Sequence, residues 1–167
     1  HCLRGQDLHK GEFARLLPVL EEKEFSDTVR LTLDVLEAHE LPEEYQPVLA
    51  RLVESPHVVV QKFALRKMGE FDSPAVVRTL VQQLDDQDTA RRDAAARSLR
   101  KIPAARTVLT KEFLACADPS KAWVIAEILP VYEGKWKRDT LDGVWKRLDA
   151  ALAAEERIAG AHLHFLK

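Results

Sequence analysis

The chain has 167 residues, of which 46% are hydrophobic and 31% are charged, as is typical of one soluble globular domain. Its formal net charge is −2, which argues against a dedicated binder of nucleic acid or anionic membranes, because such proteins carry an excess of Lys and Arg. The two cysteines are too few for a disulfide framework, so we expect a reducing compartment, the cytoplasm.

Targeting and membrane segments are not expected. The sequence has no apolar run near the roughly 18 residues that a spanning helix needs. Its N-terminus lacks the basic and apolar regions of a secretory signal. The first residue is His1 and the single methionine is Met68. We therefore expect residues 1–167 to be one domain from a longer polypeptide, with adjoining domains among its partners.

Taken in chain order, the apolar residues recur at helical spacing in successive pairs of segments. Pro42, Pro74 and Pro103 each follow a turn and stand near the start of such a segment, where proline's missing N–H costs nothing. Asp72 or Ser73 is the expected N-cap before Pro74. The predicted helix pairs lie at residues 8–39, 41–70, 73–102, 103–132 and 136–167.

The second helix of each of the first four pairs repeats at an offset of 31 residues, with a slip of one residue at the end of the fourth copy. A fixed period of this size indicates stacked helical units, because one helix pair cannot bury its own apolar face. The alanines at residues 94–96 have small side chains, which allow the backbone of this helix to pack close to a neighbouring helix. The predicted fold is an all-α solenoid whose repeat positions are Val29, Val60, Ala64, Ala95, Leu99 and Ala126.

The segment "LDDQDTARRDAAARSLRKI" (residues 84–102) resembles the second helix of short bacterial HEAT repeats, also called phycobilisome-lyase-like HEAT repeats. Their pattern is an Asp-rich turn, then Val-Arg, then an Ala-rich stretch that ends in Leu. Asp86 and Asp88 match the turn and Arg92 the arginine, whereas Arg91 occupies the valine position. The resemblance implies a right-handed, armadillo-like α-α superhelix of about five hairpins, whose second helices line a concave face. This scaffold serves many functions.

One position of the repeat brings together the candidate partner-binding residues. Arg30, Gln61, Arg92 and Trp123 follow one another at the 31-residue spacing. The interaction hypothesis is a concave groove that takes a protein or peptide, with Arg91 as an added contact. The alternative is that the arginines bond to turn aspartates and tie neighbouring repeats together, and that Trp123 packs at the edge of the solenoid.

A non-catalytic scaffold is therefore the predicted function, with no cofactor and no metal. The sequence has no P-loop, GxSxG or HExxH motif, and His162 and His164 are expected on different faces of one helix. The helical stripe around Trp145 predicts a core position for that residue.

Two further families are alternatives. Some HEAT-like bacterial alkylpurine DNA glycosylases carry Trp and Asp on a basic surface, for which the chain offers Trp123, Trp136, Arg138 and Asp139. A phycobilin lyase subunit is the other, and no chromophore site is apparent for it.

Overall fold

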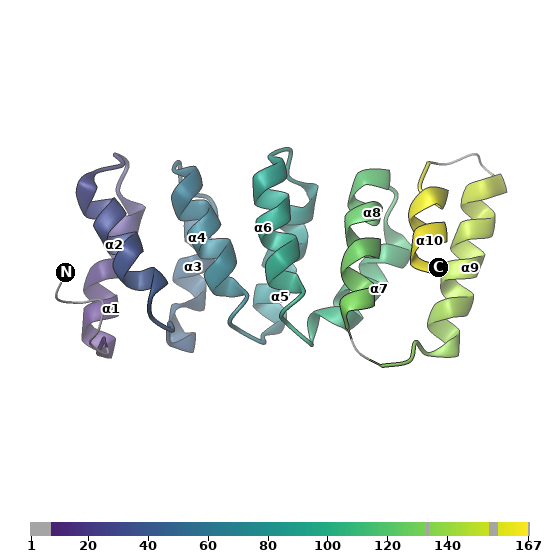
Figure 1. Ribbon diagram of the computed structural model, residues 1–167, viewed down its shortest axis with the longest axis horizontal. Coiled ribbons are helices and arrows are strands. Elements are labelled where there is room, and N and C mark those ends of the chain that lie inside the picture. Colours follow the sequence, from purple (N-terminus) through teal and green to yellow (C-terminus); the bar gives the residue numbers. More distant parts are fainter. Residues whose placement is uncertain (1–7, 133, 154–156, 167) are drawn as a thin grey trace.

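The computed structural model describes residues 8–132, 134–153 and 157–166, and within them the chain forms helices and no β-strand. The helices follow one another as antiparallel pairs, which we number hairpins 1 to 5 (Figure 1). The all-α class predicted from the sequence is confirmed. The elements are α1 (Lys10–Leu16), η1 (Leu17–Glu21) and α2 (Asp27–Glu37); η2 (Glu43–Tyr45), α3 (Gln46–Leu52) and α4 (Val58–Met68); α5 (Pro74–Gln82), η3 (Gln83–Asp85) and α6 (Thr89–Leu99); α7 (Ala105–Ala115), α8 (Pro119–Ile128) and η4 (Leu129–Val131); α9 (Arg138–Ala153) and α10 (Ala159–Leu166).

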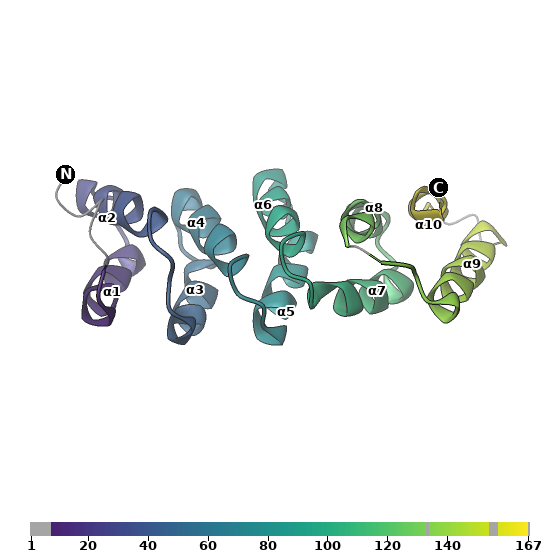
Figure 2. The ribbon, with the colours of Figure 1, turned by 60° about the horizontal axis from the view of Figure 1, so that its bottom comes forward.

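The hairpins stack side by side in two layers, with hairpin 1 and hairpin 5 at opposite ends of the row. Figure 2 shows α1, α3, α5, α7 and α9 in one layer, the first-helix layer, and α2, α4, α6, α8 and α10 in the other, the second-helix layer. Each hairpin contacts chiefly its neighbours, as expected for a solenoid built from repeats. None of the helices described is both long and apolar enough to cross a lipid bilayer.

Side-chain caps explain where several helices begin. The hydroxyl of Ser26 accepts from the Val29 amide (3.3 Å), and the Asp88 carboxylate accepts from the Ala90 amide (2.8 Å). Ser73 caps α5 through the Val76 amide. The sequence left Asp72 and Ser73 open as caps; Asp72 instead accepts from the Ala104 amide at the start of hairpin 4 (3.3 Å), so it joins two hairpins.

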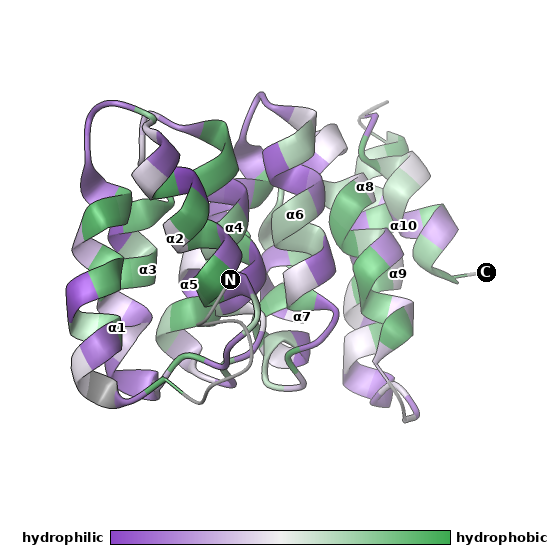
Figure 3. Ribbon diagram, turned by 60° about the vertical axis from the view of Figure 1, so that its left-hand side comes forward, coloured by the Kyte–Doolittle hydropathy of each residue, from purple (hydrophilic) through white to green (hydrophobic). Residues whose placement is uncertain are grey.

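The core runs unbroken from hairpin 1 to hairpin 5, and each helix carries both hydrophobic and hydrophilic segments (Figure 3). The repeat positions Val29, Val60, Ala64, Ala95, Leu99 and Ala126 are all fully buried. α4 and α6 approach closely, since a Cβ added to Gly69 at the end of α4 would lie 2.9 Å from Ser98 Cβ. Small residues therefore set the spacing of hairpins 2 and 3.

Trp145 corrects the prediction of a core position, because 51% of it is exposed. Its neighbours Val144 and Leu148 on α9 are buried. A helical stripe shows which side of a helix is apolar, but burial requires another element to cover the whole stripe. Among the described helices, none covers the part of α9 on which Trp145 lies.

Candidate functional site

The predicted ladder of partner contacts lies along the second-helix layer, but its four residues differ in exposure. Arg30 on α2 and Trp123 on α8 are exposed, Arg92 on α6 is half-buried, and Gln61 on α4 is only 9% exposed. The 31-residue register therefore places this position at the edge between the exposed and buried sides of the helices. Only Arg30 and Trp123 are therefore exposed enough to contact a partner.

Gln61 points into the protein. Its amide nitrogen donates a hydrogen bond to the Ser55 carbonyl in the turn before α4, and its amide oxygen is buried without a partner. Because an amide held by its own turn is inaccessible, Gln61 is not a partner-contacting residue, which corrects that assignment.

Arg30 and Arg92 bond within their own hairpins. Arg30 Nη2 lies 3.2 Å from Asp27 Oδ1, and both side chains are largely exposed, so the pair adds little to stability. Arg92 donates to the Asp86 carbonyl (3.0 Å) and to the Thr89 hydroxyl (3.2 Å). Neither arginine ties one repeat to the next.

Arg91 forms that tie instead. Its guanidinium makes an ion pair with Asp86 (3.0 Å) and donates to the Gln83 side chain (2.9 Å) and to the Val53 carbonyl of hairpin 2 (3.3 Å). Both charged side chains are less than one-fifth exposed. Arg91, where the family pattern has valine, therefore links hairpins 2 and 3, and its assignment as a partner contact stays a prediction.

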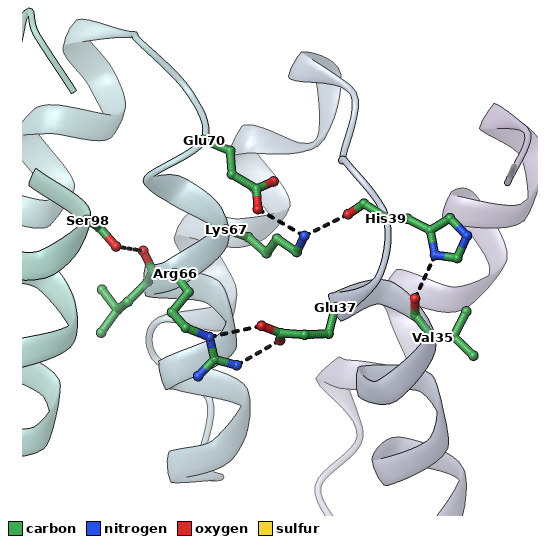
Figure 4. A network of polar contacts seen from close by, with 8 residues as sticks. Val35, Glu37, His39, Arg66, Lys67, Glu70 and Ser98 are labelled. Carbon is green, nitrogen blue, oxygen red and sulfur yellow. Dashed lines mark hydrogen bonds and ion pairs between the residues drawn. The ribbon is translucent and has the colours of Figure 1, made fainter. Parts of the chain in front are cut away.

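A second set of polar contacts joins hairpin 1 to hairpin 2 (Figure 4). Arg66 on α4 makes a two-pronged pair with Glu37 at the end of α2, with bonds of 3.1 and 2.7 Å. The nearly buried ammonium of Lys67 donates to the His39 carbonyl (2.7 Å) and to Glu70 (3.0 Å). Sequence reasoning missed both, although Glu37 and Arg66 stand 29 residues apart, close to the repeat length.

Three exposed apolar side chains lie on the adjacent helices α2 and α4. Leu31 is 55% and Val59 54% exposed, and Val58 is similar. Val59 also lines a hollow of about 320 Å³ between the two helices, together with Asp34 and the Arg66–Glu37 pair. We call Leu31, Val58, Val59 and this hollow the α2–α4 patch. An apolar centre with a charged rim is the usual composition of a protein interface.

Trp123 is engaged by its own molecule. Its indole N–H donates to Glu127 (3.0 Å), and its ring stacks on His164 of α10 with a centroid distance of 4.9 Å. The side chain nevertheless remains 44% exposed. Trp123 therefore packs hairpin 5 against hairpin 4 and also keeps a surface that a partner can touch.

Burial shifts the pKa of two groups near the C-terminal hairpins. His162 is fully buried against Phe113 (ring centroids 4.4 Å apart), and desolvation lowers its pKa. Its Nδ1 donates to the Ile158 carbonyl (3.0 Å) and its Nε2 has no partner. Desolvation raises the pKa of Tyr132 to about 12, and its hydroxyl donates to the Leu99 carbonyl. Both groups are neutral core residues near pH 7.

The residues singled out for the glycosylase alternative do not all meet. Trp136 and Asp139 line one pocket between α7 and α9, whereas Trp123 lies in the second-helix layer on α8. Arg138 pairs loosely with Asp142 at 3.9 Å. No group of three His, Cys, Asp or Glu side chains that could hold a metal occurs in the part of the chain that the structure covers.

Comparison with protein families decides what the repeats are. The family model described as HEAT repeats matches residues 45–129, which span hairpins 2 and 3 and most of hairpin 4. The chain belongs to the HEAT-repeat family. The sequence matches no curated protein and no solved structure. HEAT repeats commonly mediate protein–protein interaction. The narrower likeness of this HEAT-repeat protein to the phycobilisome-lyase-like type stays a prediction.

Proposed function

We propose that this HEAT-repeat protein is a non-catalytic scaffold that binds another protein through the α2–α4 patch. The observation that carries the proposal is the exposure of the apolar side chains Leu31, Val58 and Val59 on two adjacent helices, with Val59 lining a hollow between them. Monomeric proteins seldom leave clustered apolar side chains in water without a use for them. The rim charges of Asp34 and Arg66 supply orientation rather than most of the affinity.

A rigid face suits this function. The bidentate Arg66–Glu37 pair and the Lys67 bonds hold α2 and α4 in fixed relation, so little ordering is needed when a partner docks. Arg30 and Trp123 remain exposed on the same layer and serve as outer contacts for a partner that extends beyond the patch.

Site-specific photo-crosslinking tests the proposal. A photoreactive residue at position 59 should capture a partner protein in cells that make this chain, and Leu31→Asp should abolish that capture. The control position is Val131 on η4, which is 51% exposed but lies away from the patch. Circular dichroism of each variant verifies that the helices remain. Equal capture from positions 59 and 131, or capture unaffected by Leu31→Asp, would remove the patch as the interface.

A DNA-repair enzyme is the second candidate, and one observation favours it: Trp136 and Asp139 share a pocket with several cations. Against it stand the net charge of −2 and the separate location of Trp123. Phosphate-backbone binding weakens steeply with salt. Affinity for duplex DNA measured across a salt series distinguishes the candidates, since a scaffold shows no tight, salt-sensitive binding.

A further inference from the structure

A pocket of about 450 Å³ lies in the first-helix layer between α7 and the start of α9. Among the residues that the structure describes, its charged lining consists of Arg106, Lys111, Lys135, Lys137 and one carboxylate, Asp139. The pocket thus has an excess of positive charge, whereas the chain as a whole has a net charge of −2. Such a local reversal of sign attracts a small anion.

Arg106 builds one wall of this pocket by holding the connector between α8 and α9. Its guanidinium donates to the carbonyls of Gly134 (3.5 Å) and Lys135 (3.2 Å) and lies 4.2 Å from the ring centroid of Trp136. Gly134 makes the turn possible, because its φ of 104° is in the region that favours glycine. The connector is therefore fixed where Lys135 and Lys137 line the pocket.

The other walls come from α7 and α9. Thr107, Lys111 and Leu114 recur at helical spacing on one face of α7, and Thr140 of α9 also lines the pocket. A Cβ added to Gly143 would lie 3.4 Å from Leu114, so the two helices approach closely beside the pocket. The threonine hydroxyls add neutral hydrogen-bond donors to the cationic lining.

The three lysines carry charges that no group in the described part of the chain balances. Within the described chain, the ammonium groups of Lys111, Lys135 and Lys137 make no hydrogen bond or ion pair. By contrast, Lys67 pairs with Glu70, and Lys121 pairs with two carboxylates. Like charges that share one pocket repel each other, and a bound anion relieves this repulsion.

We propose that the α7–α9 pocket binds a phosphate monoester. This ligand carries a charge of about −1.5 to −2 at pH 7 and three strong acceptor oxygens, which match the positive excess and the Lys and Thr donors. A ligand with a single carboxylate group has only one negative charge, so it would leave much of the positive charge of the pocket unbalanced. A nucleic-acid strand fits less well, because its backbone needs an extended basic stripe. The indole of Trp136 is also already engaged by Arg106 and Phe165, which limits stacking on a base.

This site is separate from the proposed scaffold interface, because it lies in the other layer and at the other end of the solenoid. An experiment can therefore refute the proposed interface without refuting the proposed phosphate site, and the reverse. Leu31→Asp, which removes the α2–α4 patch, should leave phosphate binding unchanged. Loss of the pocket should likewise leave photo-crosslinking at position 59 intact.

An NMR titration of the complete chain tests the proposal. The probes are inorganic phosphate, a phosphoserine peptide, the same peptide without phosphate, and a single-stranded oligonucleotide, all at low ionic strength. We expect phosphate-dependent shifts at the amides of Thr107, Lys111 and Thr140 and at the Trp136 indole. Tighter binding of the phosphopeptide than of inorganic phosphate assigns the ligand to a modified protein, and equal binding assigns it to a small phosphate compound.

Substitutions in the pocket should change the affinity for phosphate by predictable amounts. Lys111→Ala should weaken phosphate binding by about 1.5-fold to 5-fold, the range expected for losing one exposed charge interaction, and Asp139→Asn should strengthen binding. Lys146→Ala is the matched control, because Lys146 is exposed on α9 outside the pocket. Three results overturn the proposal: no phosphate-dependent shift at the pocket, equal effects of Lys111→Ala and Lys146→Ala, or stronger binding of the oligonucleotide with shifts spread beyond the pocket.

Discussion

Replacing Gly69 by alanine tests how tightly hairpins 2 and 3 are packed. Gly69 has φ −64° and ψ −7°, which alanine adopts without strain. On backbone entropy alone, the exchange should stabilise the fold by about 0.4–1 kcal/mol. The added methyl group, however, would lie 2.9 Å from Ser98 Cβ and 3.0 Å from Ser98 Cα. Because one of these atoms is backbone, a side-chain rotation cannot relieve the contact.

The clash should therefore outweigh the entropic gain. Overpacking a well-packed core costs about 1–3 kcal/mol, and moving α6 away would also strain the bond from the Ser98 hydroxyl to the Leu65 carbonyl (2.7 Å). With mid-range values, about 2 kcal/mol lost to the clash and about 0.7 kcal/mol gained in entropy, the net loss is about 1.3 kcal/mol. We therefore expect Gly69→Ala to lower the melting temperature by about 3–5 °C, given the usual 2–4 °C per kcal/mol for a chain of this length.

Thermal unfolding followed by circular dichroism measures this effect, with Gly11→Ala as the control. Gly11 lies in α1 with open space where its Cβ would stand, so the same exchange should be neutral or stabilising there. A Gly69→Ala protein that is as stable as the parent would refute the reasoning and show that hairpins 2 and 3 can separate at little cost.

Three further predictions concern buried polar groups. Because burial holds the pKa of His162 below 6.5, the unfolded chain takes up this proton first as pH falls. The free energy of unfolding should therefore decrease below about pH 6.5 and level off below the folded-state pKa; urea titrations between about pH 7.5 and pH 5 should show less of this decrease in His162→Phe. Tyr132→Phe leaves the Leu99 carbonyl without its hydroxyl donor and should cost about 1 kcal/mol in urea unfolding at neutral pH, and an unchanged midpoint would contradict it. Arg91→Ala leaves the largely buried carboxylate of Asp86 without its ion pair and should cost about 1.5–3 kcal/mol by the same measurement, whereas Arg30→Ala, which breaks an exposed pair, should cost far less.

The fold could be predicted from the sequence because the pattern of buried apolar residues repeats along the chain. Burial of Val60 or Leu99 depends on which side of the helix faces the neighbouring hairpins. Because the hairpins repeat, equivalent positions are buried in each copy. Caps at Ser73 and Asp88 were equally local, since a side chain that accepts from an amide two or three residues ahead needs no knowledge of the tertiary fold.

The site residues were harder to predict because their surroundings are not periodic. Gln61 stands where Arg30 is exposed, yet it bonds to the Ser55 carbonyl of its own turn. The α7–α9 pocket combines two helices and a connector that does not follow the repeat. Four of its charged residues were present in the sequence as separate lysines and one aspartate. Only the course of the connector around Gly134 brings them together.

The uneven spacing of the second helices has a mechanical consequence. α4 packs closely with α6, and α8 with α10, whereas α2 with α4 and α6 with α8 meet through fewer residues. Across the α6–α8 seam, polar links such as the Lys121–Asp85 pair (2.8 Å) supplement this smaller apolar contact. The Arg66–Glu37 pair and the Lys67 bonds strengthen the contact between α2 and α4. Under a bending force we therefore expect hairpins 1 to 3 to move as one stiff block and hairpins 4 and 5 as another, so that curvature changes mainly where hairpin 3 meets hairpin 4.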